Sequence, residues 1–128
     1  MDPERNLMAR SRNSAKQAGA RFEREAADYL AEHVSEFIDR RVKSGAKDLG
    51  DIANVRTRHN EKVVVEVKNV MKQALPQWTK EAHQEAENDN ALVGVVVHKR
   101  HGCGTMGDQW VTMTLDDLVA LLTGQRPK

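Results

Sequence analysis

Two short apolar runs dominate the pattern of hydrophobic and polar positions along the chain. Residues 63–68 (VVVEVK) have the β-branched composition of a strand, and residues 92–97 (LVGVVV) form a continuous apolar run of the kind that is buried on both faces of a sheet. Between them, Pro76 opens an amphipathic stretch that predicts a helix over residues 76–88. A strand, a helix and a strand in this order indicate an α/β fold.

A longer helix is predicted near the start of the chain, from Ser14 to about residue 35. Ser14 and Gln17 have the spacing of a capping box. Glu23 departs from the polar face of this helix, because it lies four residues from both Gly19 and Ala27, at the buried edge. A carboxylate there is costly unless it meets a partner or a metal. The apolar stripe of the helix comprises Phe22, Ala26, Tyr29, Leu30 and Val34.

The other predicted elements are short and separated by turn-forming residues. They are strands at 37–42, 49–56 and 110–113, turns at 44–47 and 59–61, a Gly-rich loop at 98–108, and a helix at 115–123 that Thr114 and Asp117 cap and Gly124 ends. The order α-β-β-β-α-β-β-α predicts a mixed central β-sheet flanked by helices. We expect a flexible basic arm over residues 1–13, one domain over 14–124 and a tail over 125–128.

Composition fits one compact domain with an ordinary core. The chain has 128 residues, of which 39% are hydrophobic and 30% are charged. No apolar run approaches the roughly 20 residues of a membrane span, and no charged-then-apolar leader opens the chain. Its single cysteine, Cys103, is unable to form an internal disulfide. We therefore expect a cytoplasmic protein that does not enter a membrane.

Charge is nearly balanced overall, with a formal net charge of +1, but it is unevenly distributed. Basic residues cluster in two segments, one over residues 10–24, from the end of the predicted arm into the first helix, and one over residues 40–47. They are Arg10, Arg12, Lys16, Arg21 and Arg24, then Arg40, Arg41, Lys43 and Lys47. One such cluster alone is as well explained by a solvated face. Two clusters on either side of a candidate catalytic site favour a polyanionic partner.

The candidate site lies at the end of the strand over residues 63–68. Side chains alternate along a strand, so Glu66 and Lys68 share one face. A hairpin that turns about residue 60 would bring Asp51, on the preceding strand, near Lys68. Two adjacent carboxylates bind Mg²⁺ well, and a lysine beside them would orient a water or stabilise the charge of a transition state. The alternative is a surface ion pair of Glu66 with Lys68 and a turn residue at Asp51, which the placement of Glu23 disfavours.

These residues resemble the signature of the PD-(D/E)xK nuclease superfamily, with Asp51 followed by Glu66-Val67-Lys68. Within it the chain is most similar to the archaeal-type Holliday junction resolvases and their small phage-encoded relatives. The supporting motifs are Gly19-Ala20-Arg21-Phe22-Glu23-Arg24-Glu25, Arg40-Arg41, Ser44-Gly45-Ala46-Lys47, Asp51-Ile52 and the strand with Trp110. Leu49-Gly50 stands where the name-giving proline is expected.

The resemblance implies a restriction-endonuclease-like core. It implies that Glu23, Asp51 and Glu66 are metal-linked acids and that Lys68 is the catalytic lysine. It also implies a homodimer, in a host cytoplasm if phage-encoded, that cuts two strands of a branched DNA with Mg²⁺ or Mn²⁺ and no small-molecule cofactor.

We therefore expect a metal-dependent, structure-selective DNA endonuclease that resolves four-way junctions. One alternative keeps the chemistry but acts on DNA ends, flaps or specific duplex sites. A second is a non-catalytic DNA-binding module, against which the intact Asp51, Glu66 and Lys68 argue. The residues expected to bind DNA are Arg10, Arg12, Lys16, Arg21, Arg40, Arg41, Lys43, Ser44 and Lys47.

Two other groups of residues invite a functional interpretation. His98, His101 and Cys103 have zinc-binding side chains but lack a clear fourth ligand, so a polar loop is favoured. Trp78 and Trp110 could stack on bases, but tryptophans at helix and strand positions are more often core or interface residues.

Overall fold

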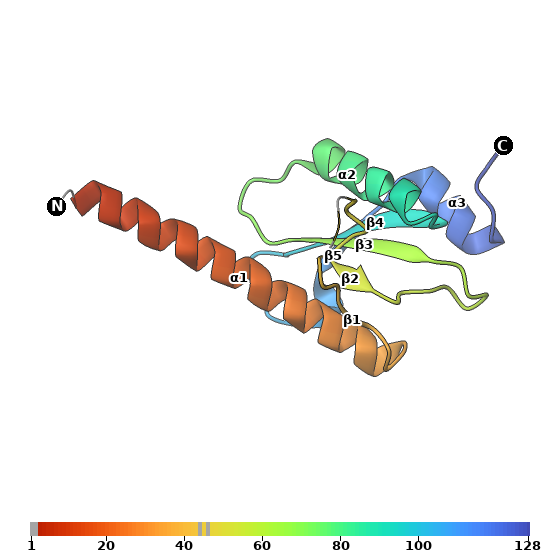
Figure 1. Ribbon diagram of the computed structural model, residues 1–128, viewed down its shortest axis with the longest axis horizontal. Coiled ribbons are helices and arrows are strands. Elements are labelled where there is room, and N and C mark those ends of the chain that lie inside the picture. Colours follow the sequence, from red (N-terminus) through yellow and green to blue (C-terminus); the bar gives the residue numbers. More distant parts are fainter. Residues whose placement is uncertain (1–2, 44, 46) are drawn as a thin grey trace.

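A computed structural model of the chain gives the backbone of residues 3–43, 45 and 47–128, and side chains from residue 12 onward within those ranges. It is an α/β structure with a five-stranded mixed sheet and three α-helices (Figure 1). The helices are α1 (Pro3–His33), α2 (Leu75–Asn88) and α3 (Leu115–Thr123), and a short 3₁₀ helix is η1 (Met106–Asp108). The strands are β1 (Asp39–Arg40), β2 (Ile52–Ala53), β3 (Val63–Lys68), β4 (Val93–His98) and β5 (Trp110–Thr112).

The sheet follows the chain order β1-β2-β3-β4-β5. β1, β2 and β3 form an antiparallel meander, β3 and β4 are parallel, and β5 returns antiparallel to β4. Helix α2 makes the connection that the parallel pair needs. The order of elements and the mixed sheet are as predicted.

Both faces of the two central strands are covered by helices. On one face, Val65 and Val95 pack with Ala26 and Ala27 of α1, and Ala120 of α3 joins the same core. On the other face, Val96 packs against residues of α2; its buried partners there are Trp78 and Ala82. Figure 1 shows α1 and α2 on opposite sides of the sheet, with α3 beside α2. This layering explains why the residues of β3 and β4 are almost continuously apolar.

Helix α1 begins eleven residues earlier than expected. The prediction placed its start at Ser14, but the helix begins at Pro3 and runs without a break through Ser14. Proline is favoured in the first turn of a helix, where its missing N–H is not needed. Residues 3–13, expected to be a flexible arm, are therefore helical in this structure.

The first two strands are much shorter than the predicted segments 37–42 and 49–56. Gly50 and Asn54 flank β2 with positive φ angles of 96° and 68°, which interrupt the strand on both sides. Around β1, Ile38 is buried in the core, but Phe37 and Val42 are strongly exposed, and β1 itself spans only Asp39–Arg40.

The last helix forms as predicted. The Thr114 side chain accepts a hydrogen bond from Asp117 N, the Asp117 side chain accepts one from Thr114 N, and Gly124 ends the helix with a φ of 85°. Asp117 is fully buried, and it also accepts hydrogen bonds from His83 of α2 and from Arg126. This carboxylate ties α3 to α2. Within the described residues, no helix combines the length and the apolar character that crossing a membrane requires.

Gly94 sets how closely α2 approaches β4. A β-carbon at this position would collide with the backbone carbonyl of Ala82 and lie 3.2 Å from the Ala86 side chain. We expect Gly94→Ala to lower the free energy of unfolding by about 1–3 kcal/mol, because backbone has to shift to admit the methyl group. Urea denaturation measures this effect. Gly104→Ala is the control, since nothing lies within 4 Å of its β-carbon position; equal stabilities of the two variants would contradict the packing described.

Candidate active site

Asp51 lies beside Glu66 because of the register between β2 and β3. Ile52 pairs with Val65, and Asp51 N donates to Val65 O at 3.0 Å. The Asp51 side chain then accepts a hydrogen bond from Val67 N, with Oδ2 at 2.8 Å. Asp51 and Glu66 are each only 6% exposed, and their carboxyl groups lie within hydrogen-bonding reach of each other. The structure thus brings together the two acids that the sequence pattern suggested.

A glycine allows β2 to lie this close to β3. Gly50 has a φ of 96°, and a β-carbon there would lie 2.9 Å from Val64 Cγ1 and 3.3 Å from Val65 O. Any larger residue would push β2 away from β3 and carry Asp51 with it.

Two lysines reach the acids from different directions. Lys68 Nζ lies 3.9 Å from Glu66 Oε2 and 2.9 Å from Glu81 Oε2 of α2. Lys43 Nζ lies 3.3 Å from Asp51 Oδ1, and its side chain is largely exposed. Lys68 therefore borders the acids as expected, but in this structure Glu81 is its closer partner.

Helix α2 contributes a third buried carboxylate, Glu85, which is 4% exposed. Its carboxyl group lies within hydrogen-bonding reach of Glu66. In an amphipathic helix such as α2, acids are expected on the outer polar face, but Glu85 lies on the buried one. The signal that identifies Glu85 is its position three residues after Ala82 and seven after Trp78, on the buried face of α2.

The pKa values reflect the crowding of these acids. Burial, reinforced by Asp51 and Glu85, raises the pKa of Glu66 to about 11. Burial also raises the pKa of Glu85. Burial would raise the pKa of Asp51 too, but hydrogen bonds from Glu66 and Val67 N, together with Lys43, outweigh it and hold that pKa below its usual range. Without a cation, Asp51 is ionised and Glu66 carries a proton.

Glu23 is placed on α1 and is partly buried. Its Oε1 accepts a hydrogen bond from Arg40 Nε at 3.0 Å, an ion pair between α1 and β1. Among the contacts of the described residues, the structure does not bring Glu23 to Asp51, Glu66 or Lys68. Its role as a metal-linked acid stays a prediction, and the partner that offsets its burial is Arg40.

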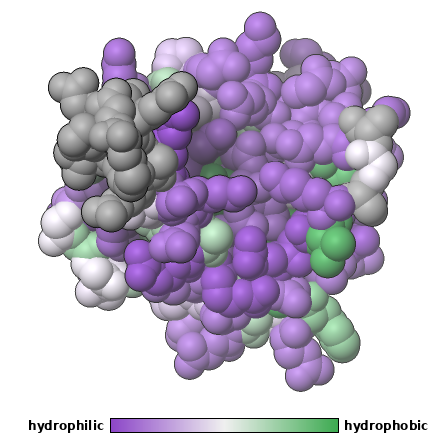
Figure 2. Space-filling view, turned by 60° about the vertical axis from the view of Figure 1, so that its left-hand side comes forward, coloured by the Kyte–Doolittle hydropathy of each residue, from purple (hydrophilic) through white to green (hydrophobic). Residues whose placement is uncertain are grey.

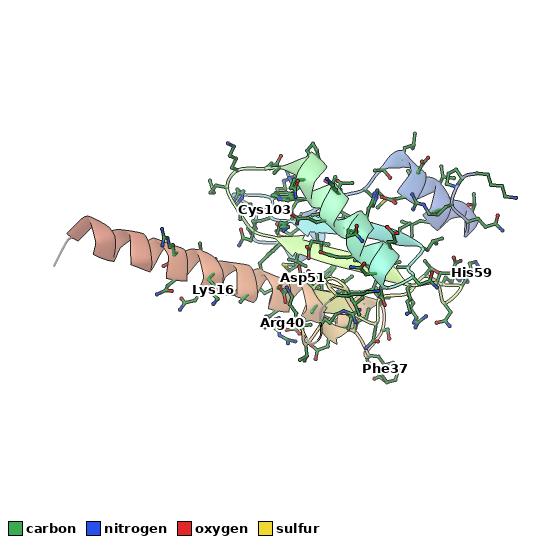
Figure 3. All side chains as sticks on the ribbon, turned by 45° about the horizontal axis from the view of Figure 1, so that its top comes forward. Lys16, Phe37, Arg40, Asp51, His59 and Cys103 are labelled. Atoms are coloured by element: carbon green, nitrogen blue, oxygen red, sulfur yellow. The ribbon has the colours of Figure 1, made fainter. Side chains whose placement is uncertain are left out.

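The expected DNA-binding residues fall into two regions. Arg12, Lys16 and Arg21 are exposed along α1, and Figure 3 shows Lys16 far from Asp51, with Arg40 much closer. The second region is a pocket of about 250 Å³, beside Asp51 through Lys43. Its lining residues are Arg41, Val42, Lys43, Gly45, Lys47, Asp48 and Leu49. The Arg10 side chain and Ser44 lie outside the described residues.

The candidate zinc ligands have other partners. His98 is buried in β4, where its Nε2 lies 2.7 Å from Thr112 Oγ1, and His101 Nε2 lies 2.9 Å from Val70 O. Trp78 is a core residue of α2. Trp110 is 45% exposed on β5, with the Arg100 guanidinium 4.6 Å from its ring centre.

The carboxylate ligands available at this site suit Mg²⁺ or Mn²⁺ better than zinc. In the described part of the chain, no three His, Cys, Asp or Glu side chains converge to hold a metal ion. Asp51 and Glu66 form a pair of carboxylates, and Mg²⁺ is commonly bound by one or two carboxylates together with substrate phosphate and water. The pair therefore fits Mg²⁺ or Mn²⁺, whereas a structural zinc site needs four ligands.

Comparisons with known proteins return no match among family models, curated proteins or solved structures.

We expect the pH dependence of the unfolding free energy to show that Glu66 is protonated in the folded protein. An unfolded glutamate has a pKa near 4.5, whereas folding raises that of Glu66 to about 11. Between these values the folded protein keeps a proton that the unfolded chain releases, so stability without metal falls as pH rises. Glu66→Gln removes this group. Between about pH 7.5 and 9.5, its unfolding free energy should fall less steeply than that of the wild type, by up to about 1.4 kcal/mol per pH unit.

Urea denaturation in the presence of a chelator measures both slopes. The control is Glu87→Gln, an exposed glutamate of the same helix as Glu85, and it should keep the wild-type slope. Identical slopes for the wild type and Glu66→Gln would show that Glu66 is already ionised in the folded protein.

Proposed function

We propose that this protein is a metal-dependent DNA endonuclease of the PD-(D/E)xK type, with Asp51, Glu66 and Lys68 at its active site. The observation that carries the proposal is the pair of buried carboxylates, Asp51 and Glu66, with Lys68 Nζ 3.9 Å from Glu66. Two acids held together out of water repel unless a proton or a cation lies between them. A site built at this cost of stability is typical of function rather than of packing.

Each residue has a distinct task in the proposed reaction. Asp51 and Glu66 would hold a divalent cation, which when bound polarises the phosphoryl group and lowers the pKa of a water. Lys68 carries a positive charge that would face the scissile phosphate and stabilise the charge that develops there. To do so it leaves Glu81, an exchange that costs little because Glu81 is partly exposed. Val67 N holds Asp51 in place throughout.

The surroundings of the acids favour a polyanionic substrate. Arg41, Lys43 and Lys47 line the pocket next to Asp51, and Lys43 already contacts its carboxylate. A DNA phosphate in this pocket would offer Lys43 a second anionic partner. Figure 2 shows one face of the molecule, which is predominantly hydrophilic.

The shape of the DNA is proposed from the sequence resemblance. The helix with Gly19-Ala20-Arg21-Phe22-Glu23-Arg24-Glu25, the meander that carries Asp51, and the parallel connection through α2 occur in the order expected of a restriction-endonuclease-like core. On this ground the substrate is a four-way junction, cut by a homodimer with Mg²⁺ or Mn²⁺ in the cytoplasm.

A cleavage assay tests the substrate. We expect cleavage of a four-way junction in Mg²⁺ or Mn²⁺, at least about 10-fold faster than cleavage of a linear duplex of the same sequence, and none in a chelator. Gel analysis of end-labelled strands measures the rates. Equal rates on the two DNAs would reject the junction specificity and favour a nuclease of ends, flaps or duplex sites. No cleavage of any DNA, with binding retained, would favour a non-catalytic DNA-binding module.

A substitution tests the site. Asp51→Asn keeps an oxygen that accepts the hydrogen bond from Val67 N but removes the charge that would bind the cation. We expect the cleavage rate to fall by more than about 100-fold, since even residues outside a metal's ligand set cost about 10–100-fold. Junction binding, measured by gel shift in Ca²⁺, should be retained. Asp116→Asn, an exposed position on α3, is the control and should cut normally. An Asp51→Asn protein that cuts at the wild-type rate would refute this site.

A further inference from the structure

A small polar pocket lies at the base of the hairpin that joins β2 to β3. This basic pocket has a volume of about 150 Å³, and its lining includes three cations and one acid: Arg41, Arg56, Lys62 and Asp89. Arg56 and Lys62 face each other across the hairpin as an antiparallel bridge, and Asp89 caps the end of α2. Neither Arg56 nor Lys62 is among the DNA-binding residues predicted from the sequence.

The basic pocket lies on the face of the sheet that carries the buried acids. Val55 and Val63 pack into the core beside α1. Because side chains alternate along a strand, their neighbours Arg56 and Lys62 project to the other face. That face is the one covered by α2, whose last turn brings Asp89 to the pocket.

The positive charge of the basic pocket exceeds what its one acid needs. Asp89 lies 3.4 Å from Lys62 Nζ and 3.7 Å from Arg41 Nη2, which are long separations for charged hydrogen bonds. Arg41 Nε is buried without a hydrogen-bond partner among the described residues. Arg56 Nη1 donates to Asn60 O at 3.0 Å, and no acid of the described residues forms an ion pair with Arg56. A buried guanidinium N–H without a partner indicates a missing acceptor.

Packing explains only one of the three cations. Lys62 Nζ donates to Asp89 O at 3.3 Å, and a cation is favoured at the C-terminal end of a helix. Arg41 and Arg56 have no such partner at the helix end. An oxoanion would supply the acceptors, because the planar fork of a guanidinium matches a phosphate group. The pocket has room for several waters, and therefore for one such group.

Arg41 connects the basic pocket with the proposed active site. It also lines the pocket beside Asp51, and its backbone N donates to Asp51 O at 2.8 Å. In Figure 3, Lys16 and His59, which lies at the tip of the hairpin, are on opposite sides of Asp51. A DNA strand with one phosphate beside Asp51 would therefore present a further phosphate to the basic pocket.

We propose that the basic pocket binds a phosphate group of the DNA backbone next to the cleavage position, with Arg41, Arg56 and Lys62 as donors. The inference rests on the proposed function for its ligand, DNA, but not for any step of cleavage. Such a contact positions a strand without reading its bases. A free phosphate ion has the same chemistry, and the test separates the two sources.

The salt dependence of DNA binding tests the contact, measured by gel shift in Ca²⁺ on a four-way junction and on a linear duplex. Each phosphate contact adds about 0.9 to the slope of log affinity against log salt concentration. We expect Arg56→Gln to reduce this slope by about 0.9 per bound protomer and to lower affinity about 10-fold at low salt. Lys62→Gln should reduce the slope in the same way.

The matched control is Arg58→Gln, an exposed arginine of the same hairpin that does not line the basic pocket. It should keep the wild-type slope. Equal reductions in Arg56→Gln and Arg58→Gln would overturn the pocket, because they would show that only the overall charge of the hairpin matters. Melting curves verify that each variant is folded.

Inorganic phosphate separates the two sources. An unchanged slope for Arg56→Gln on both DNAs, with a melting temperature that phosphate raises less than in the wild type, would assign the pocket to free phosphate and overturn the DNA contact. The proposed function is judged separately by cleavage. A wild type that cuts junctions while Arg56→Gln keeps its slope refutes only this inference, and a wild type that neither binds nor cuts DNA refutes both.

Discussion

One hydrogen bond, from Val67 N to Asp51 Oδ2, links the fold of this protein to its candidate site. Together with the backbone bond from Asp51 N to Val65 O, it holds the register of β2 against β3 beside Gly50, where a β-carbon would lie 3.3 Å from Val65 O. A slip of one residue would turn Asp51 to the opposite face of the sheet and away from Glu66. The same interaction that pairs the strands therefore places the two acids side by side, and the proposed chemistry depends on it.

This arrangement buries several carboxyl groups close to one another, which lowers the stability of the metal-free protein. Three buried acids, Asp51, Glu66 and Glu85, lie between the sheet and α2, whose buried face also carries Trp78 and Ala82. Low exposure strengthens the repulsion between carboxylates and raises the pKa values of Glu66 and Glu85. A divalent cation would relieve both effects, so the features that destabilise the metal-free protein are those that would make it bind metal. Under the proposed function, the same residues would lower stability and bind the cation.

Periodicity and capping predicted the parts of the fold in which local and tertiary preferences agree. β3 and α3 have the predicted bounds, because the apolar run and the capping box each specify one structure. β2 is shorter than its apolar pattern because positive φ angles at Gly50 and Asn54 end it, and single residues do not reveal such angles in a sequence. Glu85 could have been found, since its place on the apolar face of α2 is the argument already applied to Glu23. That argument identifies a buried acid but not its partner: Glu23 pairs with Arg40, whereas Glu85 forms no ion pair with a lysine or arginine among the described residues.

The central claim is that the buried acids are a cation site, and a crystal structure of the protein soaked in Mn²⁺ tests it most directly. Anomalous scattering locates the metal without reference to activity or to any substrate. The account predicts the strongest peak between Asp51 and Glu66, within bonding distance of an oxygen of each. Peaks confined to exposed carboxylates, with the Asp51 and Glu66 carboxyl groups still in contact with each other, would contradict it.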